Sequence, residues 1–374
     1  MNYVAENVPL WTVTTWDKKY NAVDRTWQPQ TIKYNYLLSD ELDNINIGEG
    51  NVRLLYTGKD IGYTTEELAG ENLCEGEVVS IPWGGTPSVK YYKGKFVTGD
   101  NRIATSNNPK ELSNKYLYYY LRGHISEIAS YYRGAGLKHP SMKDVLKMKI
   151  SYPSLANQNK ICDQFDAIER IIEQRTEEIH LLDELIKARF VEMFGDCRIN
   201  PKGWTTVALG DISMVGSSKR VFVEDLQESG IPFYRGTEVG ALAEGKSITP
   251  ELFITEEHYN TLVDATGKPE IGDLLMPSIC PDGRIWVVNT EEPFYFKDGR
   301  VLWVHDIDEK YDPVFLLYTL KDRIMTDYGS IASGTTFAEL KIFALKQCQV
   351  FDVPMEEQKR FAAFINQVDK SKLS

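Results

Sequence analysis

The sequence predicts an α/β chain made of two mixed α+β arms joined by long helices, and three observations support this fold class. A residue pattern occurs twice, roughly 200 residues apart. A continuous heptad repeat lies between the two occurrences, and short strand-like runs separated by turn residues fill the remainder. We expect the arms to be related by a pseudo-twofold axis and their helices to form an antiparallel coiled coil.

The clearest evidence for duplication is a motif that opens two helical segments. Residues 153–161 and 354–361 each begin with proline and contain a glutamine, which is Gln158 in the first copy and Gln358 in the second. A repeat of this length fits a whole domain with a connecting helix, and it is too long for a solenoid unit. The predicted segments are a first arm, a central helix, a second arm and a C-terminal helix, at residues 1–152, 153–196, 197–352 and 353–374.

Apolar residues in the central helix are spaced alternately by four and three positions. This spacing predicts a helix from about Leu155 to Phe194 whose apolar seam needs a partner, and the C-terminal helix is the obvious candidate. A helix buried against its own domain is the alternative. The residues assigned to the coiled coil and to partner docking are Ile161, Phe165, Ile168, Ile172, Ile179, Leu182, Ile186, Phe361, Ile365 and Val368.

Composition indicates a folded cytoplasmic protein. Hydrophobic residues make up 42% of the chain and aromatic residues 11%, which is typical of packed globular cores. We find no membrane-spanning run and no signal peptide, and the five cysteines are scattered, as expected for reduced thiols. The net charge is −12, with a nearly neutral first arm and an acidic second arm. Any nucleic-acid binding therefore depends on local patches or on basic partners.

Motifs for catalysis and for cofactor binding are missing from the sequence. It contains no Gly-x-Gly-x-x-Gly after a strand, no phosphate-binding Gly-Lys-Ser/Thr loop, no His-Glu-x-x-His and no Gly-x-Ser-x-Gly. The Asn-Pro-Pro-aromatic tetrad that amino-methyltransferases use to hold a flipped base is also missing. We therefore predict no catalytic residue, no metal site and no cofactor in this chain, which disfavours a single-chain methyltransferase.

Residues suited to binding DNA are easier to find. Residues 83–95 combine glycines, hydroxyls, aromatics and lysines, a mixture that can approach and neutralise phosphates, and arginines of the second arm can read guanine edges. A solvated hairpin or structural ion pairs are the alternatives, and the glycine turns before each helix serve either phosphate contact or capping. The candidate DNA-binding residues are Thr86, Ser88, Lys90, Tyr91, Lys93, Lys95, Arg102, Lys138, Lys219, Arg220, Arg235, Arg284, Arg300, Thr335 and Thr336.

The chain resembles the specificity subunit of type I restriction-modification systems. The resemblance rests on the openings at Pro153 and Pro354, on residues 179–196, and on residues 200–204 followed by Leu-Gly-Asp-Ile at 209–212. It implies two target-recognition domains that each read half of a bipartite, gapped DNA site. It also implies that the helices dock two modification subunits, which hold S-adenosylmethionine and methylate adenine, and that restriction subunits join them.

One feature departs from that family. The second helix stops about 20 residues in, at Ser374, whereas family members usually continue for a few more turns. We expect the seam from Ile179 to Met193 to lack an intramolecular partner and to be covered by a modification subunit or by a second copy. A duplicated scaffold that binds proteins and no DNA is the alternative function.

Overall fold

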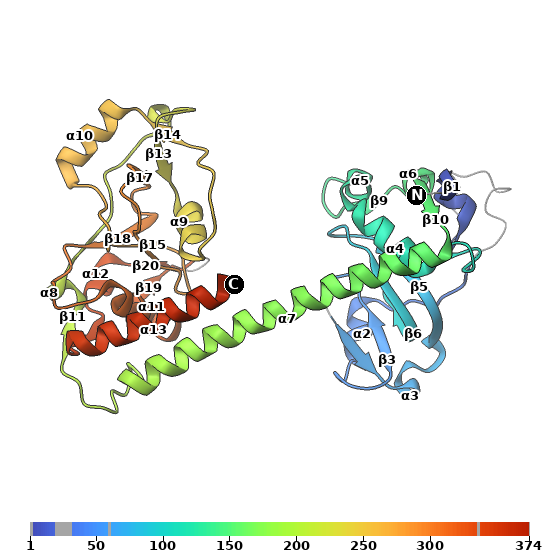
Figure 1. Cartoon of the computed structure of the whole chain (residues 1–374), viewed down its shortest axis with the longest axis horizontal. Helices are drawn as coiled ribbons and strands as arrows, with labels where there is room; N and C mark the ends of the chain where they lie inside the picture. The colour runs from blue at the N-terminus through green and yellow to red at the C-terminus, as the bar shows by residue number, and fades with distance from the viewer. Residues whose placement is uncertain (1–2, 19–31, 59–60, 335–336, 374) are drawn as a thin grey trace. The chain divides into compact units, whose positions relative to one another are not determined.

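The structure is a computed structural model that describes residues 3–18, 32–58, 61–334 and 337–373. It divides into two compact units, Met1–Arg175 and Thr176–Ser374, and the division falls inside one long helix. Both units mix helices and strands, which confirms the predicted fold class (Figure 1). The predicted 40-residue central helix is confirmed as α7, Leu155–Phe194.

The first arm is built on a six-stranded sheet with the strand order β2-β7-β5-β6-β3-β4. Buried side chains such as Trp16, Ile81 and Leu117 form the main core of this arm. The elements are β1 (Tyr3–Pro9), α1 (Leu10–Val13), β2 (Thr14–Trp16), α2 (Ser39–Ile45), β3 (Val52–Leu55), β4 (Gly62–Thr64), α3 (Glu66–Ala69), the 3-10 helix η1 (Gly70–Asn72), β5 (Cys74–Pro82), β6 (Lys90–Thr98), β7 (Asn101–Ser106), α4 (Asn114–Gly123), α5 (Ile125–Ser130), β8 (Tyr132–Arg133), β9 (His139–Pro140), α6 (Met142–Lys147) and β10 (Lys149–Pro153).

The second arm carries a four-stranded sheet, β12-β18-β15-β16, and a three-stranded sheet, β14-β13-β17. The elements are β11 (Thr206–Ala208), α8 (Leu209–Ile212), β12 (Met214–Gly216), the 3-10 helix η2 (Val223–Asp225), β13 (Ile231–Tyr234), α9 (Gly236–Ala243), β14 (Phe253–Ile254), α10 (Glu256–Thr266), β15 (Leu274–Pro277), β16 (Trp286–Val287), β17 (Tyr295–Phe296), β18 (Val301–His305), α11 (Pro313–Ile331), β19 (Ala332–Ser333), β20 (Glu339–Leu340), α12 (Ile342–Lys346), β21 (Gln349–Phe351) and α13 (Met355–Leu373).

Strand pairing repeats from one arm to the other. The pairs β1–β10, β2–β7, β5–β7 and β8–β9 correspond to β11–β21, β12–β18, β15–β18 and β19–β20. A parallel pair also recurs, β3–β6 in the first arm and β13–β17 in the second. The arms differ because the nine-residue strand β6 joins β3 and β5 in one sheet, whereas β16 and β17 are separate two-residue strands in two sheets.

Gln158 is fully buried and ties the start of α7 to the start of α4. Its Nε2 donates to the carbonyl oxygens of Glu111 at 2.5 Å and Pro153 at 2.8 Å. Its Oε1 accepts from the backbone amide of Ser113, the N-cap of α4, at 2.9 Å. Three backbone groups in the interior thereby find their partners in a single side chain.

Gln358 makes the same three bonds in the second arm. It is also fully buried, and its Nε2 donates to the carbonyl oxygens of Lys310 at 2.9 Å and Val353 at 2.6 Å. Its Oε1 accepts from the backbone amide of Asp312, the N-cap of α11, at 2.8 Å. The repeated glutamine motif is therefore a structural joint between each arm and the helix that follows it.

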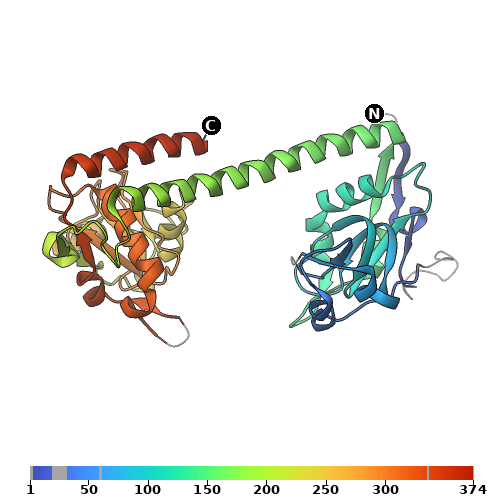
Figure 2. The ribbon, with the colours of Figure 1, turned by 90° about the horizontal axis from the view of Figure 1, so that it is seen from below.

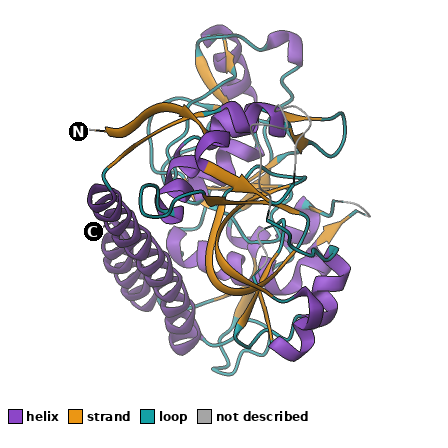
Figure 3. Ribbon diagram, turned by 90° about the vertical axis from the view of Figure 1, so that its right-hand side faces the viewer, coloured by secondary structure: helices purple, strands orange, loops and turns teal. Residues whose placement is uncertain are grey.

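Helix α13 packs antiparallel against the C-terminal part of α7 within unit 2 (Figures 1, 2 and 3). Near the start of α13, the ring of Phe361 lies 5.5 Å from the rings of Phe190 and Phe194, measured between centroids. Near its end, the Nζ atom of Lys372 lies 2.7 Å from a carboxylate oxygen of Asp183. The predicted antiparallel pairing of the two helices is thereby confirmed for this part of α7.

The expected position of the uncovered seam, Ile179 to Met193, was right at Ile179, which is 43% exposed, and wrong for the residues after it. Ile186 is 2% exposed, and Leu182 and Met193 pack against the core of unit 2. Because α13 starts beside the end of α7 and runs back along it, its 19 residues cover roughly 28 Å, which ends near Asp183. The exposed seam residues are Phe165, Ile168, Ile172 and Ile179, so the exposed part of the seam ends where the expected range begins.

Among the helices in the described ranges, none combines the length and apolar character that a membrane span requires.

Candidate nucleic-acid interface

Six candidate residues of the first arm lie on the hairpin formed by β5 and β6. Thr86 and Ser88 are in the connecting loop, whereas the lysines and the tyrosine lie on strand β6 itself. Lys95 pairs with Glu66 at 2.7 Å, and this hydrogen bond raises the pKa of Lys95 and lowers the pKa of Glu66. The candidates on β6 are Lys90, Tyr91, Lys93 and Lys95.

The other β6 candidates also have partners inside the arm. Lys93 lies 3.4 Å from Glu77, whose carboxylate accepts from the hydroxyl of Tyr91 at 2.8 Å. Lys90 donates to the carbonyl oxygens of Tyr56 and Gly58. Exposed pairs such as Lys93–Glu77 contribute little to stability, so a phosphate can replace the carboxylate at small cost.

Arg102 is buried, with 4% of its surface exposed. Its guanidinium lies 3.9 Å from the ring centroid of Trp83 and 2.9 Å from the carboxylate of Asp100. The ring of Trp83 also lies 5.2 Å from the tilted ring of His139, whose Nδ1 lies 2.7 Å from the Trp83 carbonyl oxygen. In this position Arg102 makes a structural ion pair, and through Trp83 it links the sheet to the β8–β9 hairpin.

The glycine turns predicted before each helix are the tips of two equivalent hairpins. Lys138 lies at the tip between β8 and β9 and is exposed. The corresponding tip joins β19 and β20, and the candidates Thr335 and Thr336 on it lie outside the described residues. These turns precede α6 and α12 and not the long helices directly.

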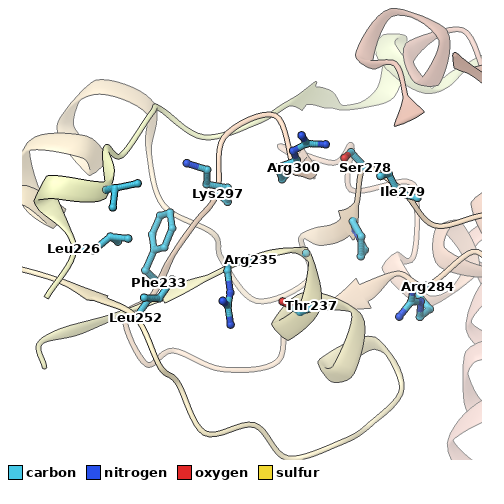
Figure 4. A pocket seen from close by; sticks show the side chains of 13 residues that line it. Leu226, Phe233, Arg235, Thr237, Leu252, Ser278, Ile279, Arg284, Lys297 and Arg300 are labelled. Atoms are coloured by element: carbon cyan, nitrogen blue, oxygen red, sulfur yellow. The ribbon is translucent and has the colours of Figure 1, made fainter. Parts of the chain in front are cut away.

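Three candidate arginines of the second arm meet around one cavity of about 500 Å³. Arg235, Arg284 and Arg300 come from the end of β13, the turn before β16 and the turn before β18, and Lys297 joins them (Figure 4). Apolar side chains make up much of the wall; they are Val223, Leu226, Phe233, Leu252, Pro277 and Ile279. An apolar wall with cations at its edge suits contact with the bases and phosphates of a nucleic acid.

Each cation at this cavity faces a carboxylate of the same arm. Arg235 is 2.6 Å from Glu238 and 3.0 Å from Glu251. Although burial opposes it, hydrogen bonding from Arg235 lowers the pKa of Glu238, and the hydrogen bond with Glu238 raises the pKa of Arg235. The remaining pairs are Arg284–Asp282, Arg284–Glu244, Lys297–Asp298 and Arg300–Glu339.

These ion pairs differ in how firmly they hold the cation. The side chain of Arg300 is 59% exposed, so its pair with Glu339 is weak in water and easily exchanged for a phosphate. Glu238 is only 12% exposed and makes hydrogen bonds with both the backbone amide and the guanidinium of Arg235. Arg300 is therefore better placed than Arg235 to leave its carboxylate for a ligand.

Lys219 and Arg220 do not line the cavity but follow two serines that hold the backbone against the segment 296–301. Ser217 Oγ donates to the carbonyl oxygen of Val301, and Ser218 Oγ donates to that of Phe296, both at 2.6 Å. Lys219 and Arg220 are exposed. Arg220 pairs with Asp298 at 3.2 Å.

Lys297 was missed in the sequence because only the arginine of its turn was considered. The turn 297–300 contains both Lys297 and Arg300, and the parallel strand pair β13–β17 delivers it beside Arg235. The signal was present, since a cation three residues before a candidate arginine shares its turn. The pairing of β13 with β17, which brings this turn to the cavity, could not be predicted from the sequence.

In the described part of the chain, no group of three or more His, Cys, Asp or Glu residues is placed to hold a metal ion. The cysteines at positions 74, 162, 197, 280 and 348 are free thiols.

Comparison with family models gives two matches, which together cover most of the chain. Residues 30–181 and 201–374 each match the type I restriction modification DNA specificity domain. The two matched segments correspond to the two copies seen in strand pairing and in the buried glutamines.

Two curated relatives and one solved structure are similar to the chain. A putative type I restriction enzyme specificity subunit from Haemophilus influenzae is 25% identical over 304 residues, 79% of this chain and 75% of the relative. The type I restriction enzyme MjaVIII specificity subunit from Methanocaldococcus jannaschii is 22% identical, over 78% of this chain and 72% of the relative. The crystal structure of a type I restriction-modification system S subunit from M. genitalium is similar in fold, with a TM-score of 0.57, 15% identity, and coverage of 98% of this chain and 89% of that one.

Proposed function

The chain belongs to the type I restriction-modification DNA specificity family, and on this premise we propose that it selects the DNA sequence on which a modification complex acts. Each arm reads one half of a bipartite, gapped site. The observation that carries this proposal is the duplication itself: the two arms share strand pairing and the buried glutamine, yet they present different side chains at their edges. Two copies of one scaffold with different edges suit two different half-sites.

Within this proposal the chain has no catalytic residue and holds no cofactor. Two modification subunits bind S-adenosylmethionine and methylate adenine, and restriction subunits join the complex to cleave. The exposed seam of α7 offers an apolar docking surface for the modification subunits, which also supply the positive charge that this chain lacks. A scaffold that binds proteins and no DNA is disfavoured, because both family matches are to a DNA specificity domain.

The test is to map methylated adenines in cells that express the chain with its modification subunits. A gapped, two-part motif that disappears when the chain is deleted supports the proposal. Exchanging residues 1–150 for those of a relative should then change one half of the motif and leave the other half intact. Unchanged methylation after deletion would refute the role in specificity.

A further inference from the structure

Leu137 and Phe337 are exposed apolar side chains at the same position of the two equivalent hairpins. Their exposed fractions are 64% and 70%. The hairpins β8–β9 and β19–β20 have the same length and lie at the same repeat distance as Gln158 and Gln358. Both copies therefore expose an apolar side chain at the same position. This repeated exposure points to a ligand that both arms share.

Glycine shapes each tip. Gly134 and Gly334 have φ of 138° and 140°, a region that other residues rarely adopt. A β-carbon on Gly134 would lie 2.6 Å from the carbonyl oxygen of Leu137, and one on Gly334 would lie 2.5 Å from that of Phe337. The backbone of the apolar residue therefore packs directly against the glycine, which fixes how the turn presents it.

Both hairpins are tied to the arm at their base. Buried Tyr132 donates its hydroxyl to the carbonyl oxygen of Pro82 at 2.9 Å. In the second arm the amide of Leu340 donates to the carbonyl oxygen of Ser278 at 2.8 Å, and Ser278 lines the cationic cavity. Figure 2 shows the strands of the β19–β20 hairpin on the side of unit 2 away from α13. Each hairpin is thus anchored to its arm by a hydrogen bond at its base.

Charged and small residues surround the tips, and this favours DNA over a protein as the ligand. Lys138 follows Leu137 directly, and the second hairpin carries Glu339, which pairs with both Arg300 and Lys341. A protein-docking patch needs contiguous apolar area, whereas each hairpin offers one exposed apolar side chain, next to Lys138 in the first arm and two residues before the Glu339 ion pairs in the second. Single Leu or Phe side chains flanked by cations are the wedges that DNA-binding proteins insert between stacked bases.

We propose that Leu137 and Phe337 are wedges that each insert between two adjacent base pairs, one in each half of the DNA site. The proposal rests on the function proposed above. The cations beside each tip contact the neighbouring phosphates, and unstacking of the step offsets part of the binding energy in a sequence-dependent way. The wedge therefore adds to specificity at a step whose base edges no side chain has to read.

The test uses the full chain in complex with its modification subunits, on duplexes with 2-aminopurine placed in turn at each position of the half-sites except the methylated adenine. Fluorescence should rise at one step in each half on binding. Leu137→Ala should abolish the rise in one half and Phe337→Ala in the other, each weakening binding about tenfold. Leu137→Phe and Phe337→Leu should keep both signals.

Matched controls are Leu68→Ala and Met325→Ala, which remove side chains of similar type, 47% and 52% exposed, in the same units. Both controls should bind like the wild type. Specific binding without a fluorescence rise, or a rise that persists in the two tip variants, overturns the wedge and leaves the proposed function intact. If the wild-type complex does not retain its methylation motif over other sequences, the proposed function itself fails.

Discussion

The two arms keep the same scaffold but use equivalent positions differently. Arg102 lies at the start of β7 and Arg300 directly before β18, yet Arg102 is buried under Trp83 whereas the Arg300 side chain is 59% exposed at a cavity. The buried glutamines, by contrast, make the same bonds in both arms. The two copies therefore share the glutamines that join each arm to its helix, whereas the equivalent arginines differ in burial and in contacts.

The largest expected effect distinguishes the two helices that follow the arms. Phe361→Ala should destabilise unit 2 by about 3–5 kcal/mol, because Phe361 is fully buried against Phe190, Phe194 and Tyr318. Phe165→Ala is the matched change on α7, where Phe165 is 45% exposed and stacks on Tyr119; it should cost about 1 kcal/mol.

Chemical unfolding of the full chain, followed separately in the two units by hydrogen exchange, measures both losses. Equal losses at the two positions would show that the seam is covered equally in both units, contrary to the packing of α13 on the C-terminal part of α7 alone.

The buried glutamines provide the opposite comparison, since here the arms should respond alike. Gln158→Leu and Gln358→Leu should each destabilise their own arm by about 2–3 kcal/mol, because each leaves three interior backbone groups without partners. Gln367→Leu, on the exposed side of α13, serves as the control and should change stability by less than about 0.5 kcal/mol. A strong effect in only one arm would mean that the joints are not equivalent.

The two equivalent arginines should separate stability from binding. Arg102→Gln should cost about 1–2 kcal/mol of stability, because it removes the cation from Trp83 and Asp100 in the interior. Arg300→Gln should leave stability within about 0.5 kcal/mol but weaken DNA binding and lower the salt dependence of affinity by about one phosphate contact. Thermal unfolding and DNA binding at several salt concentrations test both statements. A loss of DNA binding by Arg102→Gln without a loss of stability would contradict them.

Much of the scaffold was predictable from the sequence. The heptad spacing predicted the bounds of α7 and its antiparallel partner, since apolar periodicity along one helix is local information. The part of α7 after Ile179 was wrongly expected to be uncovered, because its burial depends on where α13 starts in space. The same limit applies to the site: the sequence marked Lys95 and Arg300 as cations, but their carboxylates, Glu66 and Glu339, come from distant positions.

The smallest expected effect concerns two carboxyl groups, one in each arm: Asp273 beside β15 and Glu77 on β5. Asp273 is 8% exposed and accepts from the indole nitrogen of Trp303 at 2.8 Å, and burial raises its pKa even though the backbone amide of Glu270 and Trp303 act against the rise. The folded chain therefore holds this proton more tightly than the unfolded chain. The resulting stability is fully present below the unfolded pKa of about 3.9 and is lost as pH rises through the higher folded pKa.

Asp273→Asn removes this titration while keeping an oxygen for Trp303, so unit 2 of the variant should lose less stability than the wild type as pH rises from about 4. Glu77→Gln serves as the control in the first arm, where the side chain is 30% exposed, and it should leave the pH dependence of unit 2 unchanged. Urea unfolding of the full chain at several pH values between about 4 and 7 measures the difference. If wild type and Asp273→Asn give parallel curves, burial of this carboxyl is not what distinguishes the second arm at acid pH.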